Sequence, residues 1–265
     1  MQETETSSSA HPVPAPVTIE IGPVLDSLAE RHDRAENLGV QVLNALNKPT
    51  DSLLMRLPDY ARDRLEDLTA RGLEASLHLA RHSRRVVGHQ KPWINTAAAT
   101  LTGVVGGAGG LGASLAELPV TVTLLMRSVQ AVAVDYGLDP DRPAVQRDCL
   151  LVFAASGPLS PDPGLEMSFL ASRSTLTGAT VHRAIALVAP RLAGVMGRKL
   201  AMQTVPVLGA ASAVATNLSY AQYYQQMAHV VFGLRRLSIE TGEPYDRLAD
   251  ALRARAEARA VRVSL

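Results

Sequence analysis

The stretch that decides the fold is residues 92–134, PWINTAAATLTGVVGGAGGLGASLAELPVTVTLLMRSVQAVAV, where Glu117 and Arg127 are the only charged side chains. Its apolar residues do not alternate with polar ones, as they would in a half-buried strand, and Leu118–Val134 is almost wholly apolar, as in a buried helix. A second charge-free run covers residues 200–228. We therefore predict an all-α, multi-helix domain with two glycine- and alanine-rich apolar helical hairpins.

The composition of the whole chain supports this fold class. Hydrophobic residues make up 47% of the 265 residues but aromatic residues only 4%, which favours closely packed helices of Ala, Leu and Val. The net charge of +1 creates no field that would attract nucleic acid. Cys149 is the only cysteine, so an internal disulfide and a cysteine-based metal site are excluded, and a cytoplasmic location is expected. The only lysines are Lys48, Lys91 and Lys199.

The domain organisation follows from changes in composition along the chain. Residues 1–17 are polar and proline-rich and are expected to be a disordered tail. We assign N-terminal helices to residues 18–75, the main helical domain to residues 76–240, and an amphipathic C-terminal helix to residues 241–265.

Turn residues predict where individual helices begin and end. Tyr136-Gly137 should end the helix that begins near Leu118, and Asp139 or Asp141, each followed closely by a proline, should start the next one. Further helices are predicted over residues 165–173, 176–190 and 245–262, with a turn at Thr241–Pro244.

Three motifs suggest enzyme chemistry, and each also has a simpler interpretation. Residues 107–112 form a G-x-G-x-x-G, but no alternation of strands and helices follows to build a dinucleotide-binding sheet. Ser114 resembles a loose nucleophile elbow in which Ala116 replaces the second glycine. Glu74, His78 and His82 share one helix face, as zinc ligands do, but a solvated polar face has the same spacing.

Glu117 and Arg127 stand out because charges are costly in apolar surroundings unless they are paired. They are ten residues apart, about 15 Å along one straight helix, so a direct pair needs a bend at Pro119 or other partners. Glu117 is either a structural ion pair or cap, or a functional carboxylate with a raised pKa.

The two apolar runs also have the length of membrane-spanning segments. Six glycines in the first run, and an asparagine and several glutamines in the second, are poor lipid-facing residues. Small residues at helical spacing permit close helix packing, and basic residues precede both runs, as expected near anionic headgroups. Buried helices that contact the membrane surface, partial insertion and full spanning all remain open.

The residues from about 80 to 240 resemble the EcsC protein family in the order and spacing of several loose motifs. The matching features are Thr102-Gly103, the glycines from Gly106 to Gly112, Glu117 with Pro119, Arg127, Tyr136-Gly137 with Asp139, Lys199, the run from Pro206, and Asn217. The resemblance departs at Glu117, where the family often has Asp. It makes Thr102, Gly103, Glu117, Arg127, Asp139 and Asn217 the candidate functional residues.

The resemblance implies a membrane- or lipid-associated role, because the founding member is encoded beside an ABC transporter whose loss disturbs secretion. We expect a non-enzymatic accessory protein, peripheral to the inner face of the cell membrane, that binds lipid or supports a transporter or secretion system. Its partners would be membrane lipids or a membrane protein complex, compatible with a homo-oligomer, and no cofactor or metal is expected. The headgroup-binding candidates are Arg81, Arg84, Arg85 and Lys91.

Two other classes of function remain open. The family is sometimes labelled peptidase, and a hydrolase would use Glu117 with a histidine. A pure protein-interaction scaffold is the third alternative.

Overall fold

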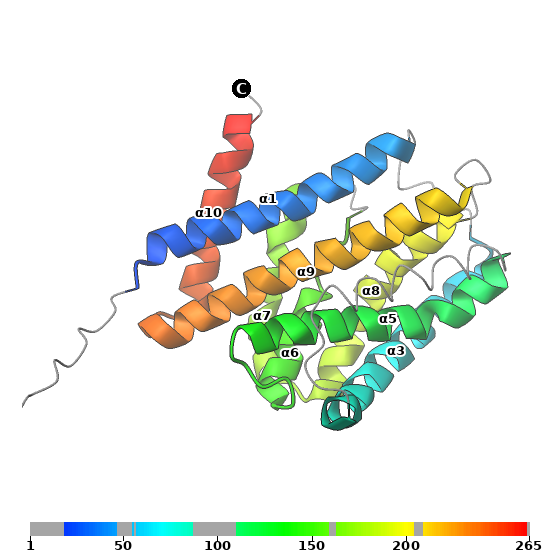
Figure 1. Cartoon of the computed structure of the whole chain (residues 1–265), viewed down its shortest axis with the longest axis horizontal. Helices are drawn as coiled ribbons and strands as arrows, with labels where there is room; N and C mark the ends of the chain where they lie inside the picture. Colours follow the sequence, from blue (N-terminus) through cyan, green and yellow to red (C-terminus); the bar gives the residue numbers. More distant parts are fainter. Residues whose placement is uncertain are drawn as a thin grey trace, which may run out of the picture.

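A computed structural model describes residues 19–46, 55, 57–86, 110–158, 163–203 and 209–263. Within these ranges it describes side chains except at 39–46, 78–86, 110, 111, 113, 114, 163–166, 203, 209–216, 262 and 263. The described chain is mostly helical and contains no strand, which confirms the all-α prediction (Figure 1). The helices are α1 (Ile21–Leu46), α3 (Asp59–Val86), α5 (Gly110–Asp135), α6 (Pro143–Val152), the 3-10 helix η1 (Pro163–Ala171), α7 (Ser172–Thr177), α8 (Val181–Gln203), α9 (Gly209–Thr241) and α10 (Tyr245–Val263).

Two long apolar helices, α5 and α9, lie at the centre of the bundle. In Figure 1, α9 runs between α1 and α5. Helix α3 packs against α5 and α8, and α10 crosses α1. The largest fully buried side chains include Phe153, Tyr220, Tyr223 and Tyr224. The Tyr224 ring contacts those of Phe153 and Tyr223. The few aromatic residues of the chain are therefore concentrated in a core that is otherwise built from Ala, Leu, Val and Met.

Two helices extend through a proline that we expected to mark a boundary. We predicted that a helix begins near Leu118, but α5 begins at Gly110 and contains Pro119. We also predicted that a helix ends at residue 190, but α8 contains Pro190 and ends at Gln203. An interior proline costs about 3 kcal/mol, whereas each fully buried Leu or Val contributes about 1.5–3 kcal/mol. Buried apolar residues on both sides of each proline therefore outweigh its cost; they are Leu115, Leu118, Val122 and Leu125 in α5, and Ile185, Val188, Leu192 and Val195 in α8.

The other predicted helix ends were partly confirmed. Gly137, with φ of 71°, ends α5 in a Schellman motif in which the Leu138 N–H donates to the Ala133 carbonyl. The next helix begins at Pro143 with Arg142 as its N-cap, so neither Asp139 nor Asp141 starts it.

The region after α6 also differs from the prediction. Residues 165–173 fall mainly in η1, which α7 follows directly, and α8 begins at Val181. The Thr180 hydroxyl caps α8 by accepting a hydrogen bond from the Arg183 N–H. The sequence prediction did not use this threonine as a helix start. The turn before Tyr245 and the C-terminal helix α10 lie where they were predicted. The hairpin connections at residues 87–109 and 204–208 lie outside the described residues.

One glycine allows α3 to approach α5 closely. A Cβ atom at Gly72 would lie 3.0 Å from the Pro119 Cα and 3.0 Å from the Val122 Cβ. Such distances are tighter than most Cβ contacts, so a larger residue would require Pro119 or Val122 to shift by a few tenths of an ångström. Gly72 therefore sets the spacing between α3 and α5.

We expect Gly72→Ala to lower the free energy of unfolding by about 1–3 kcal/mol, because the added methyl group overpacks this contact. Chemical denaturation measures the change. Gly194→Ala in α8 is the matched control: no atom lies within 4 Å of its Cβ position, so the better helix former should stabilise the protein by about 0.5–1 kcal/mol. Equal effects of the two substitutions would contradict the close approach.

Candidate functional site

Glu117 faces a lysine rather than an arginine. It lies on α5 and is partly buried; burial raises the pKa of its carboxyl group, and the nearby Lys199 of α8 opposes that shift. Lys199 is only 9% exposed, and burial lowers its pKa to about 8 while Glu117 acts in the opposite direction. The one acid of the first apolar run therefore interacts electrostatically with a buried lysine at the start of the second.

Residues of α9 complete the surroundings of Lys199. The Lys199 Nζ lies 5.9 Å from the centre of the Tyr220 ring, and the Tyr220 hydroxyl donates to the Val195 carbonyl of α8 at 3.3 Å. Asn217 precedes Tyr220 by about one turn, so both residues lie on one side of α9. Asn217 is buried, and neither its amide oxygen nor its nitrogen has a hydrogen-bond partner among the residues that the structure describes.

We call the four residues Glu117, Lys199, Asn217 and Tyr220 the bundle-end site. Glu117 lies about two turns into α5, Asn217 and Tyr220 lie about two to three turns into α9, and Lys199 lies about one turn before the end of α8 (Figure 1). The site combines a cation, an acid and an unsatisfied amide inside an apolar bundle. Polar groups in such surroundings are costly unless they have partners.

The other candidate residues do not join this site. Arg127 is partly buried, and within the described part of the chain no ion pair joins it to Glu117. Asp139 is exposed, and its carboxylate accepts a hydrogen bond from the Asp141 N–H at 2.9 Å, so it organises the turn before α6. Thr102, Gly103 and Lys91 lie outside the described residues, as do the side chains of Arg81, Arg84 and Arg85.

The structure reveals a buried charge network that the sequence did not suggest. Asp148 of α6 is buried, with Arg173 Nε at 3.4 Å and Arg235 Nη1 at 3.7 Å. Burial raises the pKa of Asp148, and Arg173 and then Arg235 oppose that shift. The Arg173 guanidinium also stacks 4.0 Å from the centre of the Tyr245 ring, so the network joins α6, α7, α9 and the start of α10. We interpret it as structural, because the cavity beside it measures only about 40 Å³.

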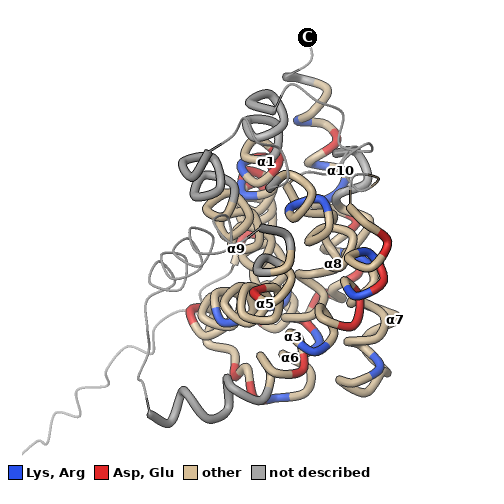
Figure 2. Tube along the Cα trace, turned by 90° about the vertical axis from the view of Figure 1, so that its right-hand side faces the viewer, with Lys and Arg blue, Asp and Glu red and all other residues tan. Residues whose placement is uncertain are grey.

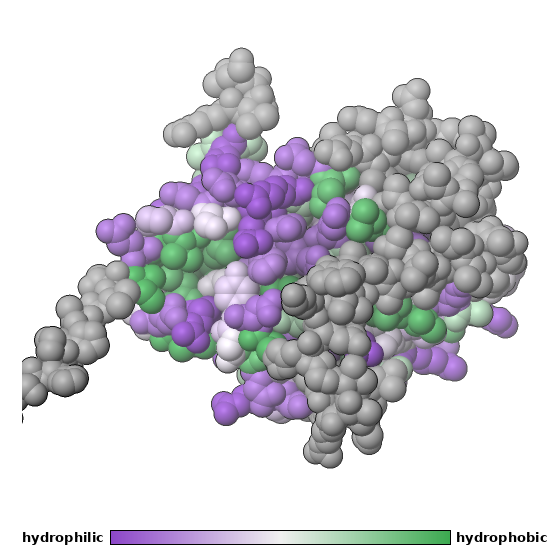
Figure 3. All heavy atoms as spheres, in the orientation of Figure 1, coloured by the Kyte–Doolittle hydropathy of each residue, from purple (hydrophilic) through white to green (hydrophobic). Residues whose placement is uncertain are grey.

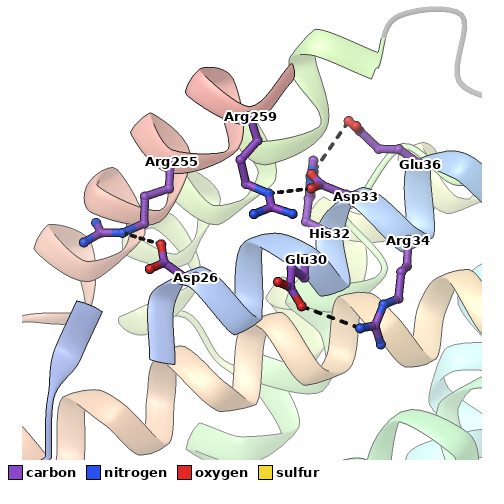
Figure 4. Close-up of polar contacts among 8 residues, drawn as sticks. All are labelled: Asp26, Glu30, His32, Asp33, Arg34, Glu36, Arg255 and Arg259. Atoms are coloured by element: carbon purple, nitrogen blue, oxygen red, sulfur yellow. Dashed lines mark hydrogen bonds and ion pairs between the residues drawn. The ribbon is translucent and has the colours of Figure 1, made fainter. Parts of the chain in front are cut away.

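A second polar cluster missed from the sequence lies where α10 crosses α1 (Figure 4). The buried His32 has its Nε2 atom 3.7 Å from the Glu36 carboxylate, and burial lowers the pKa of His32 to about 4. Burial and the neighbouring Asp33 raise the pKa of Glu36 to about 7. Arg259 of α10 donates to the Asp33 carboxylate at 2.7 Å. The spacing of His32 and Glu36, four residues apart on one helix, is the sequence signal that could have revealed this cluster.

Replacing both Glu117 and Lys199 by apolar residues should stabilise the protein, because two charges taken out of water cost more than apolar side chains of similar volume. We expect the double variant Glu117→Leu/Lys199→Met to raise the free energy of unfolding by about 1–4 kcal/mol at pH 7, whereas Lys199→Met alone leaves the Glu117 carboxylate without its cation. The folded-state pKa of Lys199 lies below its unfolded value, so the wild type recovers stability as the pH rises above about 8. The advantage of the variant should therefore shrink by about 1 kcal/mol between pH 7 and pH 9.

Urea denaturation at the two pH values measures both effects, and Lys199→Arg is the control that keeps the charge. A Glu117→Leu/Lys199→Met protein that is less stable than the wild type at pH 7 would contradict the view that the buried charge is costly.

Comparison with known proteins agrees with the resemblance noted in the sequence. Residues 32–237 match the EcsC protein family, a range that begins within α1 and ends within α9. The match thus starts well before residue 80, where the resemblance in the sequence motifs begins. No curated protein and no solved structure showed a significant match. Because the matched range covers most of the 265 residues, the chain belongs to the EcsC protein family.

Proposed function

We propose that this chain is a membrane-associated accessory protein that binds lipid at the bundle-end site and so supports a transporter or secretion system at the inner face of the cell membrane. The observation that carries the proposal is the buried Lys199 opposite Glu117. Folding alone favours an apolar residue at this position, so a lysine kept there at a cost in stability suggests a task other than folding. A cation inside an apolar helix bundle suits a ligand with an anionic headgroup and an apolar chain.

The apolar character of α5 supports contact with a membrane. Leu115–Asp135 is long and apolar enough to cross a bilayer by length and composition, with a mean hydropathy of 1.3. In the structure, 56% of this segment is buried, and α5 packs on α3, α8 and α9. Because the core helix of a soluble protein has the same properties, we favour a folded bundle that contacts the membrane surface over full spanning.

Exposed apolar residues occur beside the bundle-end site. Val120 of α5 is 50% exposed and follows Glu117 by three residues; Leu218 of α9 is 36% exposed and follows Asn217 directly. Elsewhere the described surface mixes polar and apolar residues, as on the face in Figure 3, and Figure 2 shows acidic and basic residues interspersed rather than gathered by sign. We therefore propose that the protein approaches the membrane with the end of the bundle that contains this site.

The alternative of a hydrolase that uses Glu117 with a histidine gains no support from the described residues. His32 lies beside Glu36, the His182 Nδ1 lies 3.3 Å from the Glu74 carboxylate, and the His229 Nδ1 lies 3.4 Å from the Tyr136 hydroxyl. The charged group that acts on the Glu117 carboxyl is Lys199. A protein-interaction scaffold remains compatible with the fold and would show co-purifying protein without lipid.

The proposal predicts binding to anionic vesicles that depends on the basic end of α3. Replacing Arg81, Arg84 and Arg85 by Gln should weaken binding to phosphatidylglycerol-containing vesicles on the order of a hundredfold, since each basic residue at such a surface contributes about 1 kcal/mol. Liposome flotation over a range of lipid concentrations measures the change. Adding Lys91→Gln should weaken binding further.

The same helix supplies a matched control. Arg62, Arg64 and Arg71 are exposed in the first half of α3, and replacing them by Gln removes an equal charge. This control should bind vesicles like the wild type. Equal flotation of all three proteins with neutral and anionic vesicles would overturn the electrostatic part of the proposal.

A further inference from the structure

We propose that His32, Asp33 and Glu36 bind a divalent transition-metal ion, with Zn²⁺ as the best-suited ion. One potential ligand atom from each of these residues lies within 4.8 Å of the other two. All three residues come from two consecutive turns of α1, a rigid element that fixes their relative positions (Figure 4). The proposed site is separate from the bundle-end site and does not depend on the proposed function.

The distances require only side-chain adjustment. Ligand bonds of about 2.0–2.1 Å in tetrahedral geometry place ligand atoms about 3.3 Å apart. The His32 Nε2 and the Glu36 Oε1 are already 3.7 Å apart. Asp33 and Glu36 are only partly buried, so rotation of their side chains is able to close the remaining gap.

The buried histidine is the observation that points to a ligand. The His32 side chain is only 4% exposed, and neither ring nitrogen has a hydrogen-bond partner among the residues that the structure describes. An unsatisfied buried polar group costs about 1–3 kcal/mol, so such groups normally have a partner. A metal ion on Nε2 would provide that partner, and the nearby carboxylates would supply the negative charge that the ion requires.

The ligand set selects the class of metal. One imidazole with two carboxylates suits Zn²⁺, Mn²⁺ or Fe²⁺, whereas Ca²⁺ and Mg²⁺ prefer oxygen ligands alone. Three protein ligands also leave at least one coordination position open.

The open position has space around it. Asp33 and Glu36 line a surface hollow of about 540 Å³, together with Glu30, Arg34, Asn37, Arg259 and Ala260. A water molecule or a small ligand therefore has access to the ion.

The C-terminal helix orients one of the proposed ligands. The Arg259 Nε donates to the Asp33 Oδ2, and the Arg255 Nε of the same helix donates to the Asp26 carboxylate at 3.1 Å. The hydrogen bond to Oδ2 leaves Oδ1 of Asp33 available to the ion. Metal ligands commonly have such a second partner that holds them in position.

Titration of the full-length, chelator-treated protein with Co²⁺ and then Zn²⁺ tests the proposal. Co²⁺ reports its coordination through visible absorption, and Zn²⁺ should displace it. The wild type should bind one equivalent. Glu36→Gln, which keeps the side-chain shape, should weaken binding at least tenfold, and His32→Gln should weaken it at least as much. Circular dichroism verifies that each variant is folded.

Two control proteins make the test specific. Glu30→Gln removes an acid from the same hollow but not from the ligand set, and it should bind Co²⁺ like the wild type. A variant with His78→Gln and His82→Gln tests the histidine pair of α3. The proposal is overturned if the wild type binds no Co²⁺, if Glu30→Gln weakens binding as much as Glu36→Gln, or if binding is lost only in the His78/His82 variant.

Discussion

The burial of α5 is the constraint on which the rest of the structure depends. This helix carries two charges in 26 residues before its terminal Asp135, and most of its apolar surface has to be removed from water. Helix α3 covers one side through the close contact at Gly72, and α8 and α9 cover others. The resulting apolar packing outweighs the cost of the proline that interrupts the hydrogen bonds of α5.

Enclosing α5 in this way has an electrostatic consequence. Glu117 is partly buried on α5, and the Lys199 side chain, which acts on it electrostatically, is buried. Their mutual attraction offsets only part of the cost of burial, as the lowered pKa of Lys199 indicates. The bundle thus keeps a cation, a carboxyl group and the unsatisfied amide of Asn217 in a place where folding favours apolar residues. The protein keeps polar groups at positions where apolar residues would make it more stable. This observation is the physical basis for our proposal that the site binds a ligand.

The sequence predicted features that depend on local chemistry and missed those that depend on tertiary packing. The absence of alternating patterns indicated helices, and Gly137 marked the end of α5 because a positive φ angle favours glycine. The helix boundaries predicted near Pro119 and Pro190 were wrong, because local propensity does not include the burial on both sides of a proline. Glu117 was recognised as unusual, but its neighbour Lys199 lies on another helix, so the pairing could not be read from spacing. The His32–Asp33–Glu36 cluster does lie within five residues, yet its importance rests on the burial of His32, which only the fold reveals.

The most direct test of this account is the pKa of Lys199, measured by NMR titration of the lysine side chains. The chain contains only Lys48, Lys91 and Lys199, so three signals need to be resolved, and Lys199→Arg assigns one of them. The account predicts that this signal titrates near pH 8 and shifts to lower pH in Glu117→Gln, which removes the favourable carboxylate. A Lys199 pKa near the ordinary value of about 10.4, unchanged in Glu117→Gln, would contradict both the burial of this lysine and its interaction with Glu117.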